Sequence, residues 1–400
     1  MSQLFAGPAA AMYLADQGAD VIKLEPPGLG DNSRDHNTSP HLGNMSRPFL
    51  AFNRNKRSIV VDTYRPEGME VVRRLARQAD VMLVSLRQNS ARRLGLTYED
   101  FQPLNPRLVY ASISAFGPQG PDSDMPGYDL VIQARAGILD ARRMPDGTPV
   151  TTPVLVGDMA VPLMLSYAIA LALIERERSG QGQKIEAALL AAAIAMQAPY
   201  LVQVEGDEPG ETVQPRGSAV ATPYRCSDDQ WLQIVLVTMD QWKRFCHALD
   251  LPHLADDPDY DTYSKREANS YQVYPVFEGV FATRPRSQWL KVLVDAGIPC
   301  AAIGGREMVF NDPQVKANQM LVEREHPLVG KVTSLGIPFS MSRTPGAIRS
   351  PAPALGQHTR EILLDYGFNS EEVQNLVEAE VVHQWDGRHP SMPGTTSAQS

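Results

Sequence analysis

The stretch Gly7–Glu25 reads GPAAAMYLADQGADVIKLE and predicts a helix followed by a buried strand. Pro8 stands in the first helical turn, where its missing N–H costs little, and good helix formers continue to Asp16. Gly18 then ends the helix, and the apolar run Val21–Leu24 has the length of a strand. This helix–strand unit sets the pattern for the rest of the N-terminal half.

The same alternation continues for another hundred residues. The expected elements are a strand at Ser58–Val61, a helix at Pro66–Gln78, a strand at Val81–Val84, a short helix at Ala91–Leu94 and a strand at Leu108–Ile113. Strands that alternate with helices at this spacing predict an α/β fold with a parallel, doubly wound, Rossmann-like sheet. Met1–Ala6 has too little apolar content for an opening strand, so either the sheet forms without that strand or the chain begins late.

Composition narrows the class of protein. The 400 residues carry 37 Lys+Arg and 46 Asp+Glu, a net charge of −9, which argues against a nucleic-acid-binding role. Residues 1–100 nevertheless hold 13 basic and 11 acidic side chains, so a small anionic ligand can dock there. The longest apolar runs, Val161–Ile174 and Ala187–Ala198, are shorter than the ~20 residues of a membrane span, and we expect none.

Cysteine and histidine usage predicts neither disulfides nor a metal site. The three cysteines are widely spaced, which indicates reduced thiols and a cytoplasmic location, with a mitochondrial or peroxisomal one left open if the natural N-terminus is longer. The eight histidines show no metal-ligand spacing. Because GxGxxG, P-loop and GxSxG motifs are also missing from the sequence, a nicotinamide dehydrogenase is disfavoured.

A set of short segments, in order along the chain, resembles one known family. The segments are Ala6-Gly7-Pro8, Leu14–Glu25, Gly30-Asp31, Arg34, Asn53–Ser58, Pro66-Glu67-Gly68, Ala79-Asp80-Val81, Arg93–Leu96, Asn105-Pro106-Arg107, Gly127-Tyr128-Asp129, Gly157-Asp158, Ser179–Gln183 and Leu355–Thr359. Together they resemble the class III CoA-transferase (CaiB/BaiF) family, which also contains formyl-CoA and carnitine CoA-transferases and the α-methylacyl-CoA racemases.

The resemblance implies transfer of CoA from an acyl-CoA to a free carboxylic acid. Asp158 matches the family's nucleophile, which forms an aspartyl mixed anhydride and then an aspartyl-CoA thioester. A carboxylate suits this role because it can itself carry CoA, which divides one hard exchange into easier steps. CoA is then a substrate, and we expect no permanently bound cofactor. From spacing alone, Asp158 could instead cap the helix that begins at the following apolar run.

The resemblance also implies a set of CoA contacts at the carboxyl ends of the strands. Carried over position by position, they are Phe5, Ala6, Val61, Asp62, Thr63, Tyr64, Ser85, Leu86, Arg87, Arg93, Pro126, Gly127, Tyr128 and Asp129. Arg93 matches an arginine that meets a CoA phosphate, where a fork of N–H donors suits an anionic oxygen pair. For Asn53–Arg57, support of the nucleotide pocket and a simple turn are both open interpretations.

Three features bear on activity. The segment Val84–Asn89 lacks an aromatic residue that the family usually has there, and Pro162 stands where the family favours glycine. Tyr128 replaces the histidine of the racemase branch; its ordinary pKa near 10 makes it a poor base at neutral pH, so transfer is favoured over racemisation. A racemase-like isomerase and a non-catalytic acyl-CoA-binding homologue remain the alternatives. For the acid substrate we expect a short dicarboxylate such as succinate or glutarate.

The predicted domain order is a large domain at 1–200, a linker at 201–215, a small α+β domain at 216–305, a linker at 306–345, the C-terminal part of the large domain at 346–382 and a disordered tail at 383–400. By resemblance, the large domain is discontinuous and two chains form an interlocked homodimer. Trp242 and Trp289 lie on amphipathic helices and are expected in a core rather than in a ligand box. Gly217-Ser218 is either a loop over the active site or a turn.

Overall fold

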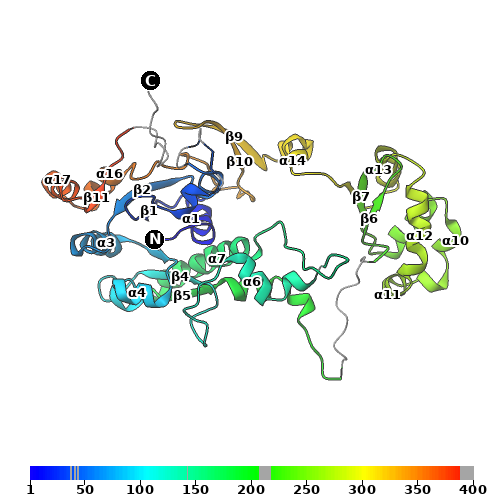
Figure 1. Ribbon diagram of the computed structural model, residues 1–400, viewed down its shortest axis with the longest axis horizontal. Coiled ribbons are helices and arrows are strands. Elements are labelled where there is room, and N and C mark those ends of the chain that lie inside the picture. The colour runs from blue at the N-terminus through cyan, green and yellow to red at the C-terminus, as the bar shows by residue number, and fades with distance from the viewer. Residues whose placement is uncertain (37, 40–41, 43–44, 142, 207–217, 388–400) are drawn as a thin grey trace. The chain divides into compact units, whose positions relative to one another are not determined.

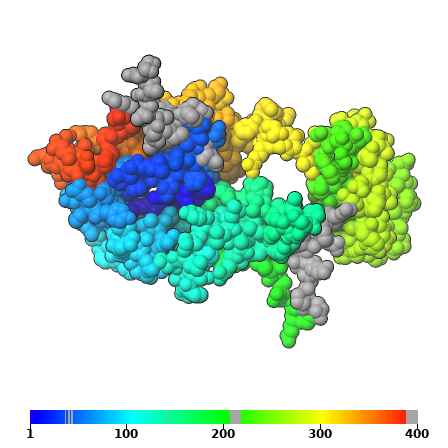
Figure 2. Space-filling model, in the orientation of Figure 1, coloured from blue at the N-terminus to red at the C-terminus, as the bar shows by residue number. Residues whose placement is uncertain are grey.

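The computed structural model describes residues 1–36, 38–39, 42, 45–141, 143–206 and 218–387 (Figure 1). The chain divides into two compact units. Unit 1 comprises Met1–Val202 together with Asn318–Ser400, and unit 2 comprises Gln203–Ala317. Unit 1 is therefore assembled from both ends of the chain, and in Figure 2 its orange and red C-terminal segment lies against the blue N-terminal segment.

Unit 1 is a mixed α/β structure. Its described strands are β1 (Val21–Glu25), β2 (Lys56–Val61), β3 (Val81–Val84), β4 (Val109–Ser114), β5 (Lys184–Ala188), β9 (Leu321–His326), β10 (Gly330–Leu335) and β11 (Val382–His383). Its described α-helices are α1 (Ala6–Asp16), α2 (Arg47–Phe52), α3 (Pro66–Gln78), α4 (Gln88–Leu94), α5 (Tyr98–Phe101), α6 (Asp129–Arg135), α7 (Val156–Ser179), α8 (Leu189–Ala195), α16 (Thr359–Asp365) and α17 (Ser370–Glu378). The strands and helices predicted over residues 7–113 are all present, with ends shifted by at most three residues.

The strands of unit 1 do not form the single doubly wound sheet that the sequence predicts. In the part of the chain that the structure describes, β1 pairs in parallel with β2, which pairs antiparallel with β11, while β3, β4 and β5 form a separate parallel sheet. The hairpin of β9 and β10 lies within the expected linker 306–345, and β11 ends inside the expected tail. The rest of that tail, from 388, lies outside the described residues.

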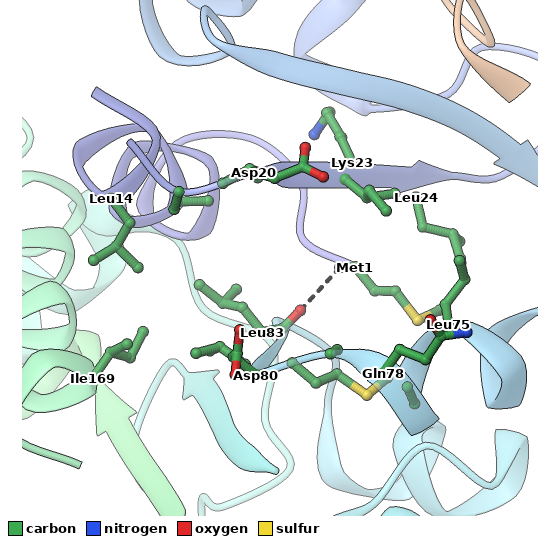
Figure 3. Close-up of a pocket in the computed structure, with 18 of the residues that line it drawn as sticks. Met1, Leu14, Asp20, Lys23, Leu24, Leu75, Gln78, Asp80, Leu83 and Ile169 are labelled. Carbon is green, nitrogen blue, oxygen red and sulfur yellow. Dashed lines mark hydrogen bonds between the residues drawn. The ribbon is translucent and has the colours of Figure 1, made fainter. Parts of the chain in front are cut away.

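A cavity of about 760 Å³ lies between the sheet that contains β1 and the sheet that contains β3. Figure 3 shows its walls, with Lys23 and Leu24 of β1 on one side and Leu83 of β3 on the other. Met1 lies along β3: its amino group donates to the Leu83 carbonyl (2.9 Å), and its carbonyl accepts from Ser85 N (3.1 Å). This alternation of bonds is that of parallel strands, so Met1 pairs with the end of β3 as a residue of a parallel strand would.

Two apolar clusters hold unit 1 together on either side of the strands. One includes Ile59 and Val61 of β2, and Leu363 of the C-terminal helix α16 packs into it. The other joins α1 to α7 through Ala10, Val161 and further aliphatic side chains. The helix α7 extends well beyond the predicted apolar run; among the described residues it is long and apolar enough by length and composition to cross a membrane, but its buried face packs on α1.

A buried ion pair and the hydrogen bonds around it connect the two chain ends. The Arg54 guanidinium binds both carboxylate oxygens of Asp16 (3.1 and 2.7 Å) and donates to the Gly336 carbonyl (3.3 Å). Asn55 donates to Asp16 (2.8 Å) and to the Ala347 carbonyl (2.8 Å). Lys56 is buried and donates only to protein oxygens of the N-terminal part. These contacts favour a structural role for Asn53–Arg57 over direct support of a nucleotide.

Unit 2 has its own sheet and core. Its strands are β6 (Pro223–Arg225), β7 (Trp231–Ile234) and β8 (Cys300–Ala302), paired antiparallel in that order. Its helices are α9 (Met239–Ala248), α10 (Pro252–Ala255), α11 (Tyr263–Ala268), α12 (Ser270–Phe281), α13 (Arg286–Asp295), α14 (Glu307–Asn311) and α15 (Pro313–Ala317). Trp242 and Trp289 are buried in its core, as the helix periodicity predicts. Gly217 lies outside the described residues, and the Ser218 hydroxyl is within 3.3 Å of that of Ser270.

Candidate active site

Asp158 lies in the first turn of α7, as its third residue. The helix begins after Leu155, whose side chain cannot cap it. The Asp158 N–H instead donates to Oδ2 of Asp129, the first residue of α6, over 2.8 Å. The alternative in which Asp158 serves only as a helix cap is therefore wrong, because the capping carboxylate comes from Asp129 on another element.

The Asp158 side chain has an unusual environment for a carboxyl group. It is half-buried and makes no hydrogen bond or ion pair with any residue that the structure describes. Burial, and to a smaller extent the nearby charge of Asp129, raise the pKa of Asp158 from its ordinary value of 3.8 to about 7. Near neutral pH the group is thus divided between its protonated and ionised forms, and the oxygens of the ionised form are free to attack an electrophile.

Asp129 is itself anchored on its other side. Only 2% of its surface is exposed, and its Oδ1 accepts a hydrogen bond from the Gln133 amide, one turn further along α6. The Oε1 atom of Gln133 in turn accepts from the Thr152 hydroxyl (2.5 Å). A line of hydrogen bonds therefore leads from Thr152 through Gln133 and Asp129 to the backbone of Asp158.

Pro162 lies deeper in the helix than a first-turn position. It is buried in the second turn of α7, where a proline cannot donate to the carbonyl four residues earlier. That carbonyl belongs to Asp158. Pro162 thus removes the helical hydrogen bond that the backbone carbonyl of Asp158 would otherwise accept. The backbone N–H of Asp158, by contrast, is held by Asp129.

Most of the other predicted contacts follow the carboxyl ends of parallel strands. Asp62, Thr63 and Tyr64 connect β2 to α3, and Ser85, Leu86 and Arg87 connect β3 to α4. Pro126, Gly127 and Tyr128 end the long connection from β4 to α6. Ligands of open α/β sheets bind at such ends, so these positions agree with a cofactor-sized ligand there.

The predicted contacts differ in accessibility. Exposed side chains, available to a ligand, are Tyr64, Arg87, Arg93, Pro126 and Tyr128. Val61 and Ala6 are buried, so only their backbone can face a ligand, and the Phe5 ring packs edge-on against Phe52. Asp129 is also buried, and both its oxygens are used inside the protein.

Hydrogen bonds join some of the segments that carry the predicted CoA contacts, while other segments have no such bond between them in the described chain. Gln3 N, two residues before Phe5, donates to the Ser85 hydroxyl (3.3 Å), so those two segments meet. Asn89 at the start of α4 pairs with Asp124, just before Pro126. Within the described chain, no hydrogen bond or ion pair joins Asp62–Tyr64 to the other predicted contacts. The cavity between the sheets is lined by none of the predicted contacts.

Sequence reasoning missed Gln133 and Thr152. The only signal was the four-residue spacing of Asp129 and Gln133, which places them on one face of a helix. In the part of the chain that the structure describes, no group of three or more His, Cys, Asp or Glu residues could hold a metal ion.

The sequence profile described as CoA-transferase family III matches residues 1–359. The chain belongs to this family. It is 34% identical to the mouse succinyl-CoA:glutarate CoA-transferase, with 96% of this chain and 88% of that one covered. It is also 34% identical to a succinate–glutarate CoA-transferase of Agrobacterium fabrum, with 91% and 93% covered. A CaiB/BaiF family protein of Brucella suis matches the structure with a TM-score of 0.78 at 32% identity, covering 92% of this chain and 97% of that one.

Family membership confirms the resemblance drawn from the short segments and makes the protein an enzyme of the CoA-transferase type. Its substrates are accordingly a CoA thioester and a carboxylic acid. The mixed α/β fold is shared with the CaiB/BaiF structure. In this family member Asp158 is half-buried and its pKa is raised to about 7, unlike that of an ordinary surface carboxylate.

Proposed function

We propose that this enzyme transfers CoA from succinyl-CoA to a short dicarboxylic acid such as glutarate, with Asp158 as the covalent carrier. The observation that carries the proposal is the half-buried Asp158 carboxyl, held by its backbone but without a hydrogen-bond partner for its oxygens in the described residues. The names of the mouse and Agrobacterium relatives support the choice of substrates.

The reaction proceeds through four acyl transfers. The ionised Asp158 oxygen attacks the thioester carbonyl of the donor, the C–S bond breaks, and a mixed anhydride and free CoA thiolate result. The thiolate then attacks the Asp158 carbonyl carbon, which gives an aspartyl-CoA thioester and releases the donor acid. The acceptor carboxylate attacks this thioester, forming a second mixed anhydride and releasing CoA thiolate once more. Attack of the thiolate on the acceptor's acyl carbon yields the new acyl-CoA and regenerates Asp158.

The environment of Asp158 suits these steps. A carboxylate that is poorly solvated and accepts no hydrogen bonds does not have to shed such partners before it attacks. The bond from its N–H to Asp129 fixes the start of α7, so the side chain begins from a defined backbone position. Arg87, in the connection after β3, and Arg93, in the last turn of α4, are both exposed, so their guanidinium groups are available for CoA phosphates.

The proposal includes a homodimer. An apolar stripe runs along α7, where Leu163, Tyr167, Leu171 and Ile174 are 56%, 67%, 47% and 55% exposed. These residues are spaced three or four apart, so they share one face of the helix. A contiguous apolar face of this kind is typical of a protein–protein interface. A second copy of the chain is the partner that the family resemblance implies.

The proposal also includes a reducing, cytoplasmic compartment, which the buried free thiols of Cys226 and Cys246 support.

The test is a transfer assay with succinyl-CoA and separate glutarate, succinate and oxalate acceptors, with new thioesters identified by mass spectrometry. Wild-type protein is expected to form glutaryl-CoA and, without acceptor, to accumulate an adduct of CoA on the peptide that contains Asp158. Asp158→Asn is expected to abolish both. The matched control is Asp35→Asn, since Asp35 is exposed and its side chain makes no hydrogen bond or ion pair with the described residues.

Three other outcomes would contradict the proposal. Exchange of the α-proton of a 2-methylacyl-CoA without formation of a new thioester would indicate a racemase-like isomerase. Binding of CoA with neither exchange nor adduct would indicate a non-catalytic homologue. Full activity of Asp158→Asn would remove Asp158 from the mechanism.

A further inference from the structure

Gln133 is a fully buried polar residue that the mechanism does not yet use, and one carboxylate connects it to the nucleophile. Its side chain has no exposed surface, and it lies in α6, behind Asp129 as seen from Asp158. Its amide nitrogen donates to Asp129 Oδ1 and to the Val154 carbonyl (3.0 Å). Because both amide hydrogens have acceptors, the orientation of the amide is determined by its surroundings.

Thr152 completes this arrangement from the other side. Its hydroxyl lies 2.5 Å from Gln133 Oε1 and 2.7 Å from the Val154 carbonyl. Thr152 and Val154 belong to the segment that leads directly into α7, so Gln133 connects α6 to the approach of the helix that carries Asp158. Flipping the Gln133 amide would place its oxygen against the Asp129 carboxylate and lose two donors, which leaves a single favourable arrangement.

Gln133 affects the position of Asp158 by holding Asp129, which lies between them. A carboxylate at a buried site needs hydrogen-bond donors to stay in place, and for Asp129 these are the Gln133 amide and the Asp158 N–H. Without Gln133, Oδ1 of Asp129 would lack its donor, and the carboxylate would be free to rotate away from the Asp158 N–H. The first turn of α7 would then lose its only side-chain cap within the described residues.

We propose that Gln133, held by Thr152, is a positioning residue that keeps Asp129 aligned with the Asp158 backbone and so fixes the nucleophile for attack. This inference rests on the proposed role of Asp158. Gln133 does not touch the substrate; it acts through two neighbours. The geometry therefore requires its effect to appear in turnover rather than in CoA binding.

The test compares Gln133→Met, which keeps the length of the side chain but removes its donors, with wild-type protein. The expected result is a fall in kcat of about 10- to 100-fold, the scale of a small misplacement of a reacting group, with KM for the acyl-CoA changed by no more than about twofold. Formation of the Asp158 adduct slows by the same factor in a single-turnover experiment. An unchanged kcat, or a rise in KM with kcat intact, would overturn the proposal.

Thr152 gives an independent series if Gln133→Met does not fold. Thr152→Val removes the hydroxyl while keeping the shape and is expected to lower kcat, whereas Thr152→Ser restores the donor and most of the rate. Thr151→Val is the matched control, because Thr151 is exposed and its hydroxyl has no hydrogen bond to the described residues. Equal kcat values for Thr152→Val and Thr152→Ser would refute the positioning role. Full activity in Asp158→Asn would instead refute the proposed function, so the two failures are distinguishable.

Discussion

Replacing Asp158 by asparagine should stabilise unit 1 at neutral and alkaline pH while it removes activity. The pKa of Asp158 is raised from 3.8 to about 7, mainly by burial and secondarily by Asp129. Each pKa unit corresponds to 1.36 kcal/mol, so the ionised wild-type side chain costs about 4 kcal/mol of folding free energy above pH 7. Asparagine carries no charge and avoids that cost.

The sign of the pH dependence follows from which state holds the proton. Below about pH 4, Asp158 is protonated in both folded and unfolded chains, and the two proteins are equally stable with respect to this group. Between about pH 4 and 7 the unfolded chain ionises first, so wild-type stability falls relative to the variant as pH rises. Above pH 7 the difference reaches its limit of about 4 kcal/mol and stays constant.

The measurement is urea unfolding at pH 5, 6, 7 and 8, with hydrogen exchange of α7 peptides used to identify the transition of unit 1. The free energy of unfolding of Asp158→Asn is expected to increase relative to that of wild type at each step up to pH 7. The free energy of unfolding of Asp35→Asn should follow the wild-type curve throughout. Parallel pH curves for wild type and Asp158→Asn would show that the Asp158 carboxyl is not perturbed, and the argument from burial would fail.

Three further outcomes are expected. Pro162→Ala should raise the stability of α7 by up to about 3 kcal/mol, because an N–H becomes available to the Asp158 carbonyl; a lower Tm would contradict this. Joining five apolar, β-branched residues directly to Met1 should fill the space between β1 and β3 and raise Tm by several degrees. The reason is that each buried Val or Ile contributes about 1.5–3 kcal/mol before the entropy of ordering is subtracted. A Gly-Ser extension of the same length should leave Tm unchanged, and equal Tm values for the two extended proteins would rule out a strand site. Tyr167→Asp in the apolar stripe of α7 should shift the protein from dimer to monomer in light scattering, and an unchanged mass would exclude this face as the interface.

Local structure followed closely from the sequence. The helix predicted at Pro66–Gln78 has those bounds in α3, because Pro66 at its start and an amphipathic pattern along it are both local signals. The strand predicted at Val81–Val84 is likewise β3. The sequence analysis does not predict strand β5, because four of the five residues of Lys184–Ala188 are Lys, Glu or Ala, which are depleted in strands, and the segment owes its conformation to pairing with β4.

The arrangement of the strands could not be derived in the same way. Each predicted strand is present, but the strands are divided between two sheets, and the pairing of β2 with β11 joins residues more than 300 positions apart, which no local pattern encodes. The union of the two chain ends depends on contacts such as Arg54 with Asp16 and the Gly336 carbonyl, the latter 282 residues away in the chain. Contacts at such separation are decided when the whole chain packs.

For the site, the sequence by itself determined the family, the presence of a carboxylate at Asp158 and the positions of the loops that follow the strands. The tertiary structure alone decided how Asp158 is placed and charged. Asp129, which lies 29 residues earlier in the chain, is buried and accepts a hydrogen bond from the Asp158 N–H. Burial shifts the pKa of the Asp158 carboxyl toward neutrality. The reason is physical: helix and strand formation respond to neighbours in the chain, whereas the pKa and orientation of a side chain respond to the dielectric, the charges and the hydrogen bonds that the folded chain brings around it.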